Sequence, residues 1–277
     1  MARSSGAASS VEVPGERNAK RCDGLPDSDA LRKLLKDAAT RGEAGGFMHG
    51  KNEWAAVVNR EGELCAVAVS VEAKPQVQDN AAAWPGSKAI AKAKAFTANA
   101  FSTDTTPMST ARLYTMSLPG HSLWGAANGN PLNPKCITAP GDKDDLHVVC
   151  GGTITFGGGV PLYKGRTRIG GLGASGDTPC ADHEVAKLVR DGAGLNPEGG
   201  KEADDIVYAG VDPPSIYQHP LCTNTWRNGT LLGNEGAALD AGGIAQALKA
   251  QATPASGVKT FQPASAASPA SASSAAR

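Results

Sequence analysis

The sequence has no apolar stretch that approaches the roughly 18 residues needed to cross a membrane, so no membrane partner is expected. It also lacks any run rich in Lys and Arg, and its 27 basic and 27 acidic side chains give a net charge of zero. Nucleic-acid binding, which depends on a basic surface, is therefore not expected. The N-terminus lacks the apolar core of a secretory signal peptide, which indicates a cytoplasmic location for the chain as written.

The six cysteines include no CxxC pair, so zinc sites built on that spacing are not expected. Their even number leaves two interpretations open, buried free thiols or disulfides. Cys136 and Cys150 bracket a polar loop and would suit a local disulfide in an oxidising compartment. The sequence does not select among the possible pairings. If disulfides form, we expect a periplasmic or secreted protein from which an export signal has been removed.

Both ends of the chain have compositions that cannot bury a core. Residues 1–27 are small, polar and charged, and residues 236–277 form a tail rich in Ala, Ser and Pro. We expect the first segment to be disordered and the tail mostly so. Residues 28–235 remain as one folded domain with a substantial core. Within it, residues 120–152 are expected to be a loop insertion, and loops this long usually have a role in binding or assembly.

Apolar periodicity predicts helices alternating with hairpins. Helices are expected to begin near Asp27, Ser87 and Thr178, which are residue types that cap a helix N-terminus. Two hairpins are expected, over residues 54–70 and 153–174. This order contains no strand–helix–strand crossover. We therefore predict a single α+β domain in which helices flank an antiparallel sheet.

Glycines gather in the second hairpin, at residues 157–159 and 170–176. Glycine in a strand lowers stability and adds no packing, so this density needs an explanation. Two explanations stay open: a ligand approaches the backbone, or a helix packs closely against the strand. The segment is neither a dinucleotide fingerprint nor a P-loop, because no crossover unit surrounds it and no Gly-Lys-Ser/Thr follows.

The helix after Thr178 begins with three consecutive ionisable residues, Asp182, His183 and Glu184. Its free N–H groups favour an anion, and Asp182 is either the partner of this helix end or an acid–base group. A helical wheel places His183 opposite the apolar stripe, where it is solvated or contacts a second subunit. Consecutive residues point in different directions, so these three cannot chelate one ion together.

His121 lies in the expected insertion, in the segment PGHSLWG, close to Trp124. A histidine in this position ligates a metal or haem iron, acts as a general acid or base, or is simply exposed. No serine elbow is present and no spaced pair of carboxylates indicates a reaction. The sequence therefore leaves open whether the protein is an enzyme.

Three segments resemble the GlcG/HbpS family of haem-associated proteins, which includes the C-terminal domain of PduO-type proteins. They are KAKAFTANAF at residues 92–101, FGGGVPLY at 156–163 and IGGLGASGDTPCADHEVA at 169–186. The resemblance extends over residues 30–194 and implies an antiparallel sheet flanked by helices, assembled into homo-oligomers. It also implies haem or a related tetrapyrrole as cofactor. The positions that match the family are Lys94, Thr97, Asn99, Gly158, Gly159, Ser175 and Asp182.

Two functions from different classes follow. The first is a small-ligand-binding protein for haem or a related tetrapyrrole, with His121 and His183 as candidate iron ligands. Its aromatic content of 5% is low for an apolar haem pocket. The alternative is a cofactor-free lyase or isomerase acting on a small carboxylate or aromatic acid. In that enzyme the glycine-rich backbone would hold the anion while His183 or Asp182 moves a proton.

Overall fold

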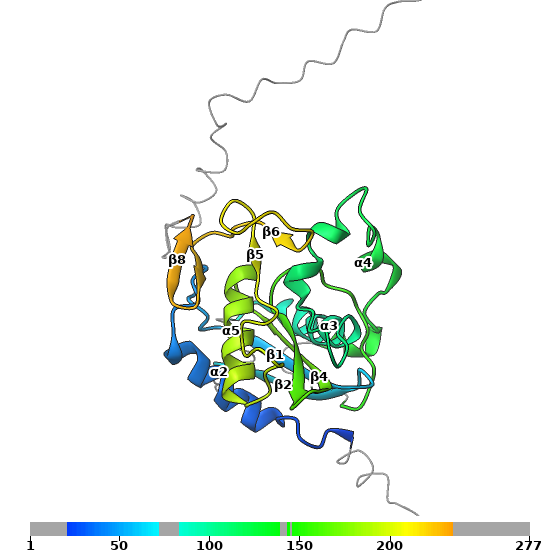
Figure 1. Cartoon of the computed structure of the whole chain (residues 1–277). Coiled ribbons are helices and arrows are strands. Elements are labelled where there is room, and N and C mark those ends of the chain that lie inside the picture. The colour runs from blue at the N-terminus through cyan, green and yellow to red at the C-terminus, as the bar shows by residue number, and fades with distance from the viewer. Residues whose placement is uncertain (1–20, 72–82, 139–142, 145, 235–277) are drawn as a thin grey trace, which may run out of the picture.

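The computed structural model describes residues 21–71, 83–138, 143–144 and 146–234. They form three layers, with one helix on one face of a four-stranded antiparallel sheet and two helices on the other (Figure 1). The predicted α+β domain, an antiparallel sheet flanked by helices, is confirmed. The tail expected after residue 235 lies outside the described residues.

The sheet is built from two hairpins that meet side by side. Its order is β2-β1-β4-β3, and β1 pairs with β4 from Trp54 opposite Ser175 to Asn59 opposite Gly170. Both predicted hairpins are present. All residues of β1 and β2 are buried, because helices cover both faces of the sheet. The strands are β1 (Trp54–Asn59), β2 (Leu64–Val69), β3 (Gly159–Lys164) and β4 (Thr167–Ser175).

Three main helices cover the sheet, and two of them begin at a side-chain cap. Asp27 accepts hydrogen bonds from the N–H groups of Asp29 and Ala30, and Thr178 accepts one from Ala181. The shorter helices lie between α3 and β3. The helices are α2 (Ser28–Arg41), α3 (Ser87–Ala100), η1 (Thr110–Leu113), η2 (Thr115–Ser117), α4 (Ala126–Gly129), η3 (Pro134–Cys136) and α5 (Pro179–Gly192).

Helix α3 lies so close to β4 that the strand has no room for side chains on that face. A Cβ atom on Gly173 would come within 3.0 Å of the carbonyl oxygen of Ala91, and one on Gly171 would do the same at Ala95. Alanines on α3 permit this approach because they add little bulk. Close helix packing therefore accounts for these two glycines.

A C-terminal arm, residues 201–233, lies over the outer face of α5 (Figure 1). Sequence patterns did not indicate its strands, because each has only two to four residues. They are β5 (Val207–Tyr208), β6 (Gln218–His219), β7 (Thr225–Arg227) and β8 (Thr230–Gly233).

All six cysteines are paired in disulfides. Cys136–Cys150 closes the insertion, as the sequence suggested. Cys22–Cys65 ties residues 21–27, part of the segment expected to be disordered, to β2. Cys180–Cys222 joins the start of α5 to the C-terminal arm. Among the described residues, no helix is both long and apolar enough to cross a membrane.

Candidate functional site

Lys94 and Asp182, two residues implied by the family resemblance, form a buried ion pair. Their Nζ and Oδ2 atoms lie 2.5 Å apart, and the side chains are 0% and 2% exposed. Nζ also donates to the carbonyl oxygen of Ala174 at 3.0 Å. The other carboxylate oxygen of Asp182 accepts from the backbone N–H groups of Gly176 and Asp177. The pair thus joins α3, the end of β4 and the start of α5.

Glu53 is a third ionisable residue in this region, and its side chain is fully buried. Burial raises the pKa of Glu53 well above its usual value, and the negative charges of Asp182 and Asp177 raise it further. Burial also raises the pKa of Asp182 to about 6, although Lys94 opposes this. Because Lys94 and two N–H groups stabilise the charged form of Asp182, we place the buried proton on Glu53. No sequence motif marks Glu53, which simply precedes an apolar strand.

A stability measurement against pH tests this assignment. Unfolding releases the proton of Glu53 once the pH exceeds 4.5, the usual pKa of the side chain. The native state therefore loses stability as the pH rises above that value, by up to about 1.4 kcal/mol per pH unit. Glu53→Gln imitates the protonated form and is expected to remove this slope, as measured by urea unfolding between pH 4 and 8. If the free energy of unfolding changed with pH in the same way for the variant and the wild type, the buried proton would not be on Glu53.

His183 is fully buried, so the expectation that it is solvated or faces a second subunit is wrong. The C-terminal arm covers this side of α5. Nε2 of His183 lies 3.4 Å from Asp205, and Lys187 donates to both oxygens of Asp205 at 2.9 Å. Burial alone would raise the pKa of Asp205, but His183 and Lys187 outweigh it and hold the pKa well below the usual range. Asp205 lies 22 residues after His183 and beyond the end of the helix, which is why the helical wheel did not reveal it.

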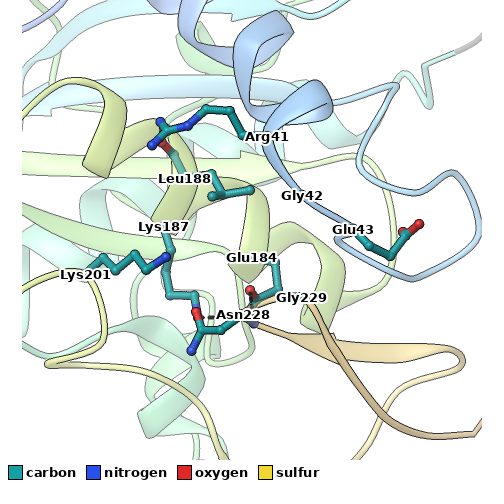
Figure 2. A pocket seen from close by; sticks show the side chains of 9 residues that line it. All are labelled: Arg41, Gly42, Glu43, Glu184, Lys187, Leu188, Lys201, Asn228 and Gly229. Carbon is teal, nitrogen blue, oxygen red and sulfur yellow. Dashed lines mark hydrogen bonds and ion pairs between the residues drawn. The ribbon is translucent and has the colours of Figure 1, made fainter.

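A cavity of about 150 Å³ opens beside this network (Figure 2). Two of the cations that line it are already engaged: Arg41 bonds to Asp191, and Lys187 bonds to Glu184 and Asp205. The cavity therefore does not present these two cations to an incoming anion. It is lined by Arg41, Gly42, Glu43, Glu184, Lys187, Leu188, Lys201, Asn228 and Gly229.

The glycines at the start of β3 leave no space for a ligand. A Cβ atom on Gly158 would lie 2.6 Å from Nζ of Lys94, and one on Gly159 would meet the side chain of Thr110. Ser175 is 4% exposed at the end of the same sheet. The structure thus brings Lys94, Asp182, Gly158 and Ser175 together in a packed region.

Thr97 and Asn99 lie on the same helix but are engaged elsewhere. Thr97 donates to the carbonyl oxygen of Ala93 at 2.7 Å and accepts from the N–H group of Ile154 at 3.0 Å. Asn99 donates to the carbonyl oxygen of Arg60 at 3.1 Å. Their hydrogen bonds fix neighbouring loops to α3.

The exposed candidate is His121. Its backbone N–H donates to Leu118 at 3.0 Å, and its carbonyl oxygen accepts from Trp124 at 3.1 Å. These two bonds close successive turns of the chain. Leu118 is 38% exposed and Trp124 63% exposed. We call these three residues the ridge; all three are exposed and lie within one stretch of seven residues.

An apolar groove of about 230 Å³ lies between α3 and residues 127–154. Helix α4, which begins two residues after Trp124, contributes Ala127 to its wall. No sequence motif indicates the groove, because its two sides come from distant segments. It is lined by Ala89, Ile90, Ala93, Ala127, Asn130, Pro131, Leu132, Gly152, Thr153 and Ile154.

Comparison with known proteins identifies a family for this chain. A family model described as haem degrading protein HbpS-like matches residues 27–190. No curated protein matches the chain. Three solved structures are similar over most of their own length. Protein ORFY of Klebsiella pneumoniae is 20% identical, covers 60% of this chain and 86% of its own, and gives a TM-score of 0.40.

The other two structures are a PduOC–haem complex and HbpS. The first is 21% identical, with 59% of this chain and 88% of that chain covered and a TM-score of 0.39. The second is 19% identical, with 68% and 95% covered and a TM-score of 0.34. The family match ends at residue 190, before the C-terminal arm begins.

Proposed function

Because the chain belongs to the HbpS-like family of haem-degrading proteins, we propose that it binds haem or a closely related tetrapyrrole. The observation that carries the proposal is the ridge, where His121 is exposed between Leu118 and Trp124. Imidazole is a common axial ligand of haem iron. Exposed apolar patches are typical of contact sites for ligands.

The residues of the ridge fit such a group better than the glycine-rich strand does. His121 would hold the iron through a ring nitrogen, while Leu118 and Trp124 would supply apolar contact to the macrocycle. Bound haem would supply the iron-centred redox chemistry. Gly158 and Gly159 face Lys94 and Thr110 with no space between them. A surface position is also consistent with the low aromatic content.

The buried histidines do not fit this role. His183 and His219 are 0% and 2% exposed, and both rings are enclosed by side chains of the C-terminal arm and α5. A porphyrin reaching either nitrogen would have to displace that arm. We therefore assign iron ligation to His121 alone.

A titration with hemin tests the proposal. We expect a saturable Soret band at one hemin per chain, and we expect His121→Ala to weaken binding by at least about tenfold, or 1.4 kcal/mol. His49→Ala is the matched control, because its side chain is 35% exposed and lies outside the ridge. Equal binding by both variants would refute the role of His121. Absence of a saturable band in the wild-type protein would refute haem binding itself.

The location of the protein, its oligomeric state and the alternative enzymatic activity are also proposals. Three disulfides support a periplasmic or secreted location, because such bonds persist in oxidising compartments. Assembly into homo-oligomers remains an expectation from the family. The alternative lyase or isomerase would use His183 or Asp182. Both are buried: Asp182 is paired with Lys94, and His183 lies 3.4 Å from Asp205.

A further inference from the structure

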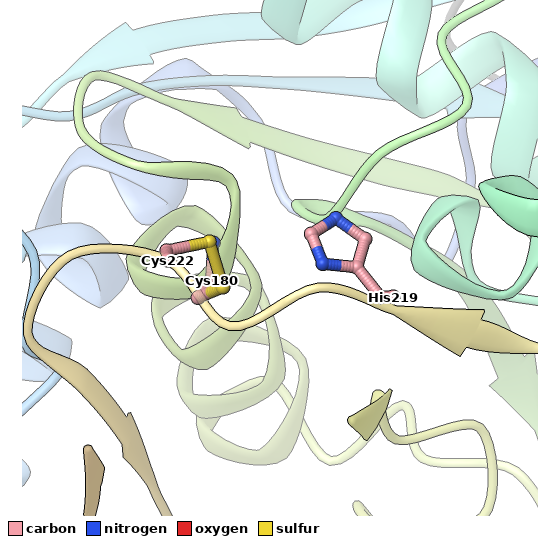
Figure 3. Close-up of side chains that lie close together, drawn as sticks. All are labelled: Cys180, His219 and Cys222. Carbon is pink, nitrogen blue, oxygen red and sulfur yellow. A yellow bond between two sulfur atoms is a disulfide. The ribbon is translucent and has the colours of Figure 1, made fainter. Parts of the chain in front are cut away.

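A buried histidine lies beside the disulfide that joins α5 to the C-terminal arm (Figure 3). The sulfur atoms of Cys180 and Cys222 and one ring nitrogen of His219 all lie within 4.8 Å of one another. Cys180 is 0% exposed and His219 is 2% exposed. The three residues come from two segments, since His219 and Cys222 are close in sequence and Cys180 is distant.

One ring nitrogen of His219 holds the imidazole in place, and the other has no hydrogen-bond partner among the described residues. Its Nδ1 lies 2.7 Å from the carbonyl oxygen of Pro220, and its ring packs against Tyr114 at a centroid distance of 4.8 Å. Within the described part of the chain, Nε2 has no hydrogen-bond partner, which is unfavourable for a buried polar atom. Burial lowers the pKa of His219 to about 4, so the ring is neutral at pH 7, the form that binds metals.

We propose that Cys180, Cys222 and His219 bind a zinc ion, or a similar divalent metal, when the disulfide is reduced. Zinc binds thiolate sulfur at about 2.3 Å and imidazole nitrogen at about 2.0 Å in a tetrahedral arrangement. Ligand atoms in such a site lie about 3.5 Å apart, so the three groups need to move by roughly 1 Å. Three protein ligands leave the fourth position to a water molecule.

The chemistry of this exchange balances. A dithiol supplies two electrons, the S–S bond of Cys180–Cys222 breaks, and the dithiol itself becomes a disulfide. The two thiols then lose their protons to solvent as the metal binds. Two thiolates cancel the charge of a divalent ion, and the neutral imidazole adds none, so the loaded site places no net charge in the interior. The C-terminal arm stays joined to α5 in both states.

One of the other two disulfides could form a competing metal site after reduction, and this site serves as the control. Nδ1 of His147 lies 3.9 Å from the sulfur of Cys22, so reduction of Cys22–Cys65 could expose a similar set. The backbone of His147 is left-handed, with a φ of 67°. His147→Asn is therefore the suitable replacement, because asparagine tolerates that conformation. His219→Asn is the matched variant at the proposed site.

The experiment uses the full chain, reduced with a phosphine, which supplies the same two electrons, and then desalted without oxygen. We expect Co²⁺ to give a thiolate charge-transfer band at one ion per chain in wild type and in His147→Asn, but not before reduction. His219→Asn should weaken binding by more than about 100-fold, since even indirect partners of a metal contribute 10–100-fold. No band after reduction, an equal band before it, or loss of binding only in His147→Asn would overturn the proposal.

A second measurement uses only the wild-type chain, so it does not depend on whether a variant folds. The reduced wild-type chain is alkylated with and without Zn²⁺, and the labelled peptides are identified by mass spectrometry. We expect Zn²⁺ to protect Cys180 and Cys222 while the other four cysteines react. Equal labelling of all six, or protection of Cys22 and Cys65 instead, would overturn the proposal.

Discussion

Replacing Lys94 by methionine is expected to lower the free energy of unfolding by about 3–5 kcal/mol. The ammonium group of Lys94 compensates the charge of Asp182 in a region withdrawn from solvent. Methionine keeps the apolar length of the side chain but leaves that carboxylate buried next to Glu53 without this cation. Removing one partner of a buried pair costs more than the pair itself contributes, because the remaining charge stays desolvated.

Urea unfolding followed by circular dichroism measures this loss. Lys33→Met is the control, because Lys33 pairs with Asp37 at 2.7 Å on the surface of α2, where its side chain is 77% exposed. Its loss should stay below about 1 kcal/mol. Adding Asp182→Asn to Lys94→Met removes both charges and should recover most of the stability. Similar losses for the two lysine variants would contradict a buried pair.

The second large effect is expected from Gly173→Ala, which should destabilise the protein by about 3 kcal/mol. The new methyl group would come within 3.0 Å of backbone atoms of both Ala91 and Ala95 on α3. Backbone atoms of a packed helix cannot rotate away as a side chain can. The helix must therefore move off β4 and lose part of its contact with the sheet.

Gly86→Ala provides the comparison for this effect. Gly86 precedes α3 with a φ of −64°, which any residue adopts, and no described atom lies within 4 Å of an added Cβ. The free energy of unfolding of Gly86→Ala, measured with urea, should differ from that of wild type by less than about 0.5 kcal/mol. If Gly173→Ala unfolds at the same urea concentration as Gly86→Ala, the close approach of α3 to β4 is not a constraint.

Apolar periodicity was sufficient to predict the central layers. Strand β1 occupies residues 54–59 as expected, and α3 begins at Ser87, because continuous apolar or alanine-rich runs determine those elements locally. The glycine density of β4 had two explanations that no local pattern separates. Only the position of α3 against Gly171 and Gly173 decides between them at those residues.

The candidate site was harder to predict because its residues act through distant partners. His183 is polar and lies on the polar side of α5, so local rules place it in solvent. Its burial depends on Asp205 and on an arm whose strands are too short to show a periodic pattern. His121 is exposed, one of the outcomes that the sequence left open, and its role as an iron ligand stays a proposal.

The polar face of α5 depends on residues that lie beyond the segment matched by the family model. Family similarity ends at residue 190, yet the guanidinium of Arg190 is fully buried against Asp204, at 2.6 and 3.0 Å. Lys187 likewise forms an ion pair with Asp205 at 2.9 Å. A chain cut at residue 190 would therefore leave these buried cations without the carboxylates of Asp204 and Asp205.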